Sequence, residues 1–138
     1  MKNRIYNLII IIFTLFISTT SVFGFSFRNM TLDFIHISDT HITDRDDTSY
    51  KALGSSKELL KDAINQINDI EGLDFVLFTG DLVDYATKEN YYNYYYLLTK
   101  LKYPSLNTFG NHDFWGMTKE EALEEVKKYN PSYSFSDS

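Results

Sequence analysis

Cysteine is absent from this 138-residue chain, which excludes disulfides and any metal site built on thiolates. A metal ion would have to be held by aspartate, glutamate, asparagine or histidine, and histidine occurs only three times. Positive charge is also scarce, with 13 basic residues against 19 acidic ones. This balance argues against binding a nucleic-acid backbone by broad electrostatic attraction. It suits a site that gathers carboxylates around cations.

The sequence also lacks a long hydrophobic run: Leu8–Ile17 is shorter than the ~20 residues that span a bilayer. This run follows Lys2 and Arg4 and precedes small residues at Val22–Gly24, as in a secretory signal peptide. We therefore expect residues 1–24 to be cleaved and the protein to be exported, whether secreted, periplasmic or on the cell surface. An uncleaved signal anchor is the alternative, and membrane contact is expected only in that case. Residues 25–138 carry 11 basic and 19 acidic residues, a formal charge of −8.

Residues 25–138 have the size of one domain, and a chain that is 43% hydrophobic can form a core. Short apolar runs predict strands at Leu32–Ile37, Phe75–Thr79 and Leu106–Phe109. Helical spacing predicts helices after capping boxes at Ser55–Glu58 and Thr118–Glu121, and after a cap at Thr87. The alternation of strand and helix predicts an α/β fold, with a layered parallel sheet flanked by helices.

Each predicted strand ends in residues that can bind metal. Ser38–His41 follows the first strand, Gly80–Asp84 the second and Gly110–Asp113 the third. The carboxyl ends of parallel strands share one edge, where ligands bind, so we expect the three loops to meet there. Asp39 and His41 are two residues apart, which in extended chain directs both side chains to one side.

The oxygen and nitrogen ligands in these loops suit Mn, Fe or Zn. Asp81 could bridge two cations with its two carboxylate oxygens, and Asn111 could add a neutral oxygen. Each motif also has a structural interpretation: Gly80–Asp81 could be a turn with a helix cap, and Asn111–Asp113 an Asx turn. The occurrence of all three motifs, each after a strand, favours the metal site over three coincidences.

The three motifs resemble those of the calcineurin-like metallophosphoesterase superfamily. The matching segments are DTH at Asp39–His41, GDLVD at Gly80–Asp84 and GNHD at Gly110–Asp113, and the resemblance covers residues 32–138. It implies an αββα sandwich, of which this chain would supply the N-terminal half. Tyr85–Ala86 stands where protein Ser/Thr phosphatases typically have Arg-Gly, which favours the phosphodiesterase branch.

The resemblance also implies a role for each site residue. The implied ligands of two divalent or trivalent ions (Mn, Fe or Zn) are Asp39 and His41 for the first ion, Asp81 for both and Asn111 for the second. His112 would protonate the leaving oxygen of the substrate or stabilise charge there, and Asp84 would hold His112 in orientation. The implied reaction is hydrolysis of a phosphoester, with a small molecule, a lipid or a nucleotide as substrate.

The family's later ligands, a lone histidine and a Gly-His-x-His segment, are missing. His36 lies in a predicted strand, and we interpret it as buried and structural; we interpret the tyrosine-rich residues 91–96 as a half-buried helix surface. We therefore expect residues 25–138 to be the N-terminal part of the domain, with exposed apolar surface, weak metal binding and little or no turnover. The alternatives are a truncated, non-catalytic secreted fragment and a metal-binding module without turnover.

Overall fold

A computed structural model describes residues 31–46, 48 and 52–131. The described residues from Leu32 onward belong to one compact unit. The signal peptide expected at residues 1–24 lies outside the described residues. In the described part of the chain, every helix is too short or too polar to span a lipid bilayer.

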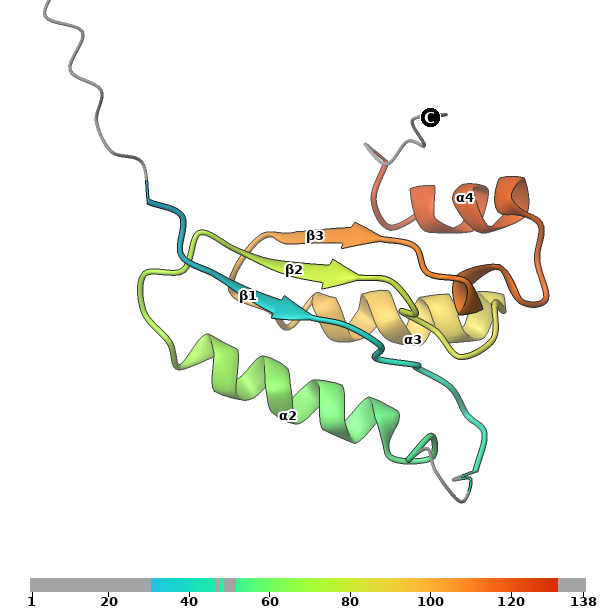
Figure 1. The fold of residues 1–138 in the computed structure, drawn as a ribbon, viewed down its shortest axis with the longest axis horizontal. Coiled ribbons are helices and arrows are strands. Elements are labelled where there is room, and N and C mark those ends of the chain that lie inside the picture. The colour runs from blue at the N-terminus through green and yellow to red at the C-terminus, as the bar shows by residue number, and fades with distance from the viewer. Residues whose placement is uncertain (1–30, 47, 49–51, 132–138) are drawn as a thin grey trace, which may run out of the picture. The chain divides into compact units, whose positions relative to one another are not determined.

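The compact unit is built on a parallel sheet of three strands in the order β1-β2-β3. The strands are β1 (Phe34–Ile37), β2 (Phe75–Thr79) and β3 (Ser105–Thr108). The helices are α2 (Ser56–Asn68), α3 (Lys88–Leu98), the short 3-10 helix η1 (His112–Phe114) and α4 (Lys119–Lys127). Figure 1 shows α2 joining β1 to β2 and α3 joining β2 to β3. The predicted α/β class and the parallel sheet are confirmed, and both are consistent with the N-terminal half of a metallophosphoesterase fold, as the motifs imply.

The third strand begins one residue earlier than predicted, at Ser105 instead of Leu106. The pairing register between β2 and β3 sets this start, since Val76 of β2 pairs with Ser105. The N–H of Val76 donates to the carbonyl of Pro104 at 2.9 Å. Strand pairing therefore starts directly after the proline, whose missing N–H does not interrupt it.

Two of the three predicted helix caps are confirmed. Thr87 accepts a hydrogen bond from the N–H of Asn90, and Thr118 forms a complete capping box with Glu121. The capping box predicted at Ser55 is wrong, since its side chain makes no cap hydrogen bond. Thr87 and Thr118 have the extended backbone that turns a side chain onto the helix start, whereas Ser55 has ψ near 1°.

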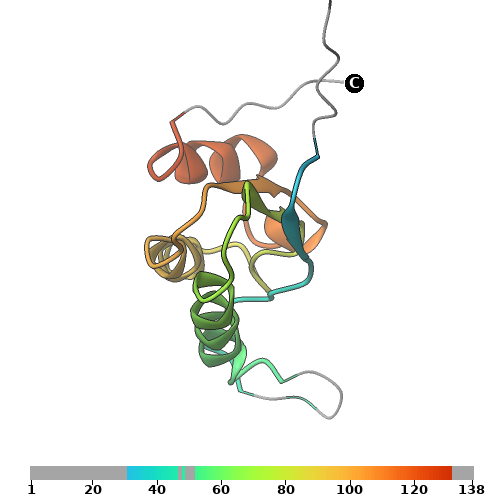
Figure 2. The same cartoon turned by 90° about the vertical axis from the view of Figure 1, so that its left-hand side faces the viewer.

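Helices α2 and α3 cover one face of the sheet, whereas α4 lies apart from α2, on the side of β3 (Figure 2). On that face Val76 and Phe78 are fully buried, and the ring of Phe78 packs edge-to-face on Tyr94 at 5.8 Å between centroids. Just after α4, Tyr129 contacts α3 and stacks on Tyr95 at 5.0 Å between ring centroids. The predicted half-buried tyrosine surface is confirmed: within α3, Tyr91, Tyr94 and Tyr95 are buried and Tyr92 and Tyr96 are exposed.

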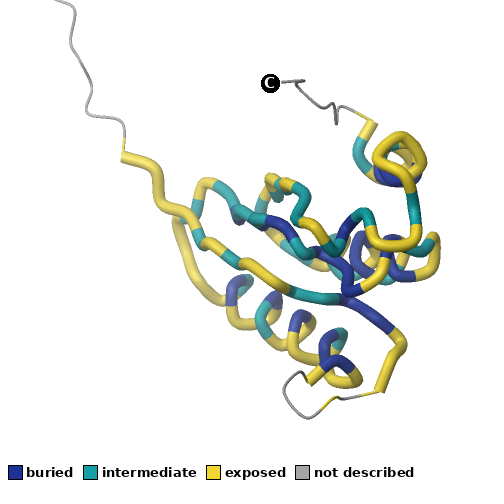
Figure 3. Tube along the Cα trace, turned by 45° about the vertical axis from the view of Figure 1, so that its right-hand side comes forward, coloured by how far each residue is buried: buried dark blue, intermediate teal, exposed yellow. Residues whose placement is uncertain are grey.

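The other face of the sheet has no helix over it among the described residues. Phe34 is 47% exposed and Leu106 52% exposed, although both lie in strands, and exposed and intermediate residues alternate along β1 (Figure 3). Exposed apolar surface was predicted and is confirmed. The prediction that His36 is buried is wrong: strand alternation directs it to this open face, where its Nε2 lies 2.5 Å from Thr79 Oγ1.

Candidate metal site

Three loops leave the carboxyl ends of the strands, and we call them together the loop cluster. It consists of a first loop (residues 38–42), a second loop (residues 80–84) and a third loop (residues 110–113). Because β1, β2 and β3 are parallel neighbours, all three loops begin at the same edge of the sheet (Figure 1). The predicted convergence of the three strand ends is confirmed.

Backbone hydrogen bonds hold the first loop beside the second. The N–H of His41 donates to the carbonyl of Asp81 at 2.9 Å, and the N–H of Ile42 donates to the carbonyl of Leu82 at 3.0 Å. Ile42 and Val83 form an isolated parallel bridge. The two loops thus continue the pairing of β1 with β2 beyond the regular strands.

Three predicted metal ligands have left-handed backbones. The φ angles of Asp39, His41 and Asp81 are 59°, 44° and 48°, and these are the positive values found for non-glycine residues in the described part of the chain. Such conformations are costly for side chains with a Cβ and concentrate at functional sites. The extended backbone assumed for Asp39 and His41 is therefore wrong, yet Asp39 Oδ1 lies 3.7 Å from His41 Nε2.

Close packing joins the second loop to the third. A Cβ placed on Gly110 would lie 2.2 Å from Asp81 Oδ1, and one on Gly80 would lie 2.7 Å from the nitrogen of Gly110. This proximity lets the N–H of His112 donate to Asp81 Oδ1 at 3.0 Å. Glycine is needed at both positions because the close approach of the two loops leaves no room there for a Cβ.

One group of side chains can hold a cation. His41, Asp81 and His112 each offer one ligand atom, and these atoms lie within 4.8 Å of one another. Imidazole and carboxylate donors fit the predicted Mn, Fe or Zn. Asp39 adjoins this group, with its side chain 62% exposed. Asn111 is exposed at the start of η1, and its role as a ligand stays a prediction.

The ring of His112 is oriented by the backbone of Asp84. His112 Nδ1 lies 2.8 Å from the Asp84 carbonyl oxygen and 3.5 Å from the Asp84 carboxylate. Because a carbonyl can only accept, Nδ1 donates the proton, which leaves Nε2 available to the site. The carboxylate of Asp84 instead accepts from Arg45 Nη1 at 2.9 Å. Sequence reasoning missed Arg45, whose only signal was its position between acidic residues of one loop.

The family model for calcineurin-like phosphoesterase matches residues 32–137. The chain belongs to this family. The resemblance carried by the three motifs is therefore confirmed at the level of the family, while the phosphodiesterase branch stays a prediction. No curated protein sequence matches the chain.

Sequence reasoning also missed a buried carboxylate in this calcineurin-like phosphoesterase. Asp113 is fully buried, and its carboxylate accepts the N–H of Val83 at 3.0 Å and the N–H of Gly110 at 2.8 Å. Burial raises the pKa of Asp113 to about 6. The cost of burying its charge outweighs the N–H donors, which by themselves would lower the pKa. The only signal was its place as the last residue of the GNHD motif.

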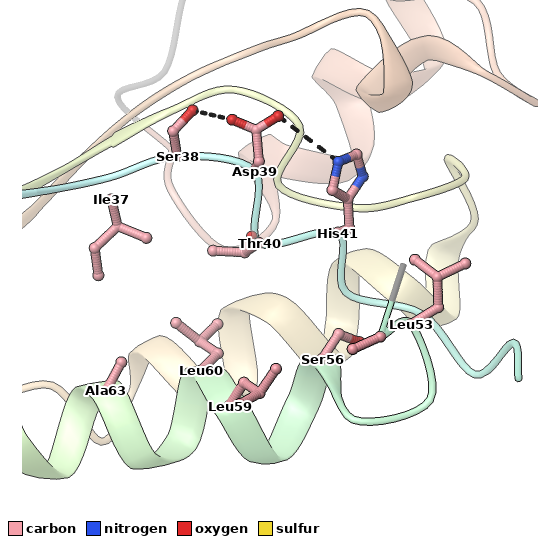
Figure 4. A pocket seen from close by; sticks show the side chains of 11 residues that line it. Ile37, Ser38, Asp39, Thr40, His41, Leu53, Ser56, Leu59, Leu60 and Ala63 are labelled. Carbon is pink, nitrogen blue, oxygen red and sulfur yellow. Dashed lines mark hydrogen bonds and ion pairs between the residues drawn. The ribbon is translucent and has the colours of Figure 1, made fainter. Parts of the chain in front are cut away.

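A pocket of about 320 Å³ opens between the first loop and α2 of the phosphoesterase. Figure 4 shows Asp39 and His41 above it, and Leu59 and Leu60 of α2 below. The pocket therefore has polar, metal-capable groups on one side and an apolar wall on the other. Such a combination can receive a substrate that has an anionic group joined to an organic part.

Proposed function

We propose that this chain contributes to the hydrolysis of phosphodiester bonds at a centre of two metal ions in an exported protein. Family membership and the group formed by His41, Asp81 and His112 indicate metal-dependent phosphoester hydrolysis as the class of activity. The observation that carries the proposal is the meeting of the three loops at one sheet edge.

Each predicted ligand has a place in this proposal. Asp39 and His41 would hold the first ion, Asp81 both ions and Asn111 the second. Bound cations would neutralise phosphate oxygens and make hydroxide available near neutral pH. The short distances from His41 Nε2 to Asp39 Oδ1 (3.7 Å) and to Asp81 Oδ2 (3.9 Å) support a shared ion at this position.

His112 would supply the proton to the leaving oxygen. Its Nδ1 is committed to the carbonyl of Asp84, so the protonated ring would donate from Nε2. Arg45 would hold the buried carboxylate of Asp84 in place, because its guanidinium provides the opposite charge at 2.9 Å. Asp84 thereby supports His112 chiefly through its backbone.

The substrate in this proposal is a small molecule, a lipid or a nucleotide that carries a phosphodiester. The pocket beside Asp39 and His41 supports this choice, since its wall of Leu53, Leu59 and Leu60 could contact the organic part. Export is proposed from the predicted signal peptide at residues 1–24.

The test combines metal binding with hydrolysis of a 2′,3′-cyclic nucleotide, a phosphodiester whose leaving alkoxide needs a proton. We expect weak binding of two Mn²⁺ ions per chain, slow Mn²⁺-dependent hydrolysis, and loss of about 100-fold or more in His112→Ala, the range for removing a general acid. His36→Ala is the matched control, because His36 lies on the open face of the sheet. Equal hydrolysis rates in wild type and His112→Ala would contradict the assignment of His112.

A metal-binding module without turnover is the second candidate. It is favoured by one observation: His112 itself belongs to the group that could hold a single ion. In that case the chain binds one Mn²⁺, and His112→Ala lowers the affinity. In the proposed enzyme, the same variant keeps its Mn²⁺ affinity and loses hydrolysis, so calorimetric titration separates the two candidates.

A further inference from the structure

We propose that Asp113 is a positioning residue, which sets the spacing between the second and third loops that metal binding requires. This inference rests on the proposed metal site but not on turnover. Asp113 follows the predicted ligand Asn111 and the predicted acid His112, and neither the motifs nor the family match assigns it a role.

The first argument is the contrast between the two junctions of the loop cluster. Backbone groups pair directly where the first loop meets the second, as in the bond from Ile42 to Leu82. Where the second loop meets the third, the backbone N–H groups of Val83 and His112 donate to the carboxylates of Asp113 and Asp81. This second junction therefore depends on the side chains of Asp81 and Asp113. Asp81 is a predicted metal ligand, whereas Asp113 is not.

The second argument is the reach of the Asp113 side chain. One carboxylate oxygen accepts from Val83 in the second loop, and the other accepts from Gly110 in the third. A single rigid group thus spans both loops, so the distance between them follows from its size. Asp81 lies two residues before Val83, and Asn111 lies one residue after Gly110. Moving either N–H would therefore move a predicted ligand.

The third argument is the support behind Asp113. The residue is fully buried, and its backbone carbonyl accepts a hydrogen bond of 2.5 Å from the hydroxyl of Tyr91 in α3. Tyr91 is itself fully buried. The third loop is thus anchored to the helix layer at the same residue that holds the second loop. Outer groups that orient ligands commonly change metal affinity 10–100-fold.

The first experiment compares Zn²⁺ affinity by calorimetry in the wild-type 138-residue chain and in Asp113→Asn. We expect Kd to rise 10-fold or more, because the amide offers one acceptor oxygen in place of two. Glu125→Gln is the matched control: Glu125 is also a buried carboxylate, but it bonds to Lys128 within the C-terminal helix region. Its Kd should stay within twofold of wild type when every protein is measured well below its thermal midpoint.

The second experiment needs no variant and covers the case in which Asp113→Asn does not fold. Amide hydrogen exchange of the wild-type chain is measured by NMR with and without Zn²⁺. Since binding and loop spacing are coupled, Zn²⁺ should slow exchange at Val83 and Gly110 several-fold. Exchange at Ile70, whose N–H bonds to the carbonyl of Ile67 just past the end of α2, serves as the internal control; it opens by local fraying away from the loop cluster and should not change.

The outcomes separate this inference from the proposed function. Unchanged Zn²⁺ affinity in a folded Asp113→Asn variant, or unchanged exchange at Val83 and Gly110 when Zn²⁺ binds, overturns the positioning role alone. Failure of the wild-type chain to bind Zn²⁺ overturns the metal site and the inference with it. Zn²⁺ binding without phosphodiester hydrolysis contradicts the proposed function and leaves the role of Asp113 intact.

Discussion

The helix-covered face of the sheet and the loop cluster at its edge are held together in different ways. On the covered face, regular strands bury Val76 and Phe78 against α2 and α3. In the loop cluster, Asp39, His41 and Asp81 have strained backbones, and carboxylates join loops that lie far apart in the chain. Apolar burial supplies the stability of such folds, and part of that stability offsets the strain at the site. Substitutions on the covered face should therefore chiefly lower the stability. Substitutions in the loop cluster should also change the pH dependence of stability and the binding of metal.

The largest effect is expected from a cavity in the covered face. Phe78→Ala removes a fully buried ring and should lower the free energy of unfolding by about 3–5 kcal/mol, measured by urea denaturation. Phe34→Ala on the open face is the control and should cost much less, because Phe34 already contacts solvent. Equal losses in the two variants would show that the open face is covered in solution.

A smaller effect is expected from the ionisation of Asp113. Its pKa is about 6 in the folded chain and near 3.8 when unfolded, so the folded state binds more protons between these values. Stability should therefore fall as pH rises from 4 to 7, by about 2–3 kcal/mol from this residue. Asp113→Asn should lack this component, which urea denaturation at several pH values can measure. Parallel pH profiles of the two proteins would contradict the raised pKa.

The smallest effect is a gain in stability within the loop cluster. Asp39→Gly relieves the positive φ at an exposed side chain and should raise the free energy of unfolding by about 0.5–1 kcal/mol. The same variant should bind Mn²⁺ more weakly, because it loses a predicted ligand. Asp39→Ala is the control, since it removes the carboxylate but keeps the strain. A gain of stability in the alanine variant as well would assign the effect to charge, and would contradict backbone strain.

Much of the fold follows from local patterns. The apolar run of β2 and the spacing of α3 each reflect neighbouring residues, so strand, helix and parallel order were predictable. Two errors mark the limit of such patterns. The face to which His36 points depends on where the helices pack, and the cap expected at Ser55 depends on a backbone angle set by the preceding loop.

The candidate site was predictable to a similar extent. Asp81, His41 and His112 stand in recognisable motifs after strands, and the structure brings them together. The contact of His112 with the Asp84 carbonyl, instead of the carboxylate, could not be predicted. Residue type indicates what a side chain can do, but not which atom of a distant residue lies within reach.

The sequence by itself determined the α/β class, the family and the three loops that carry the site. Each of these depends on short segments, whose hydrophobic periodicity and residue types can be recognised without knowing the contacts between them. Only the tertiary structure decided that Asp113 joins two loops, that Arg45 pairs with Asp84, and which face of the sheet the helices leave open. These features depend on distances between residues remote in sequence, and those distances exist only once the layers have packed.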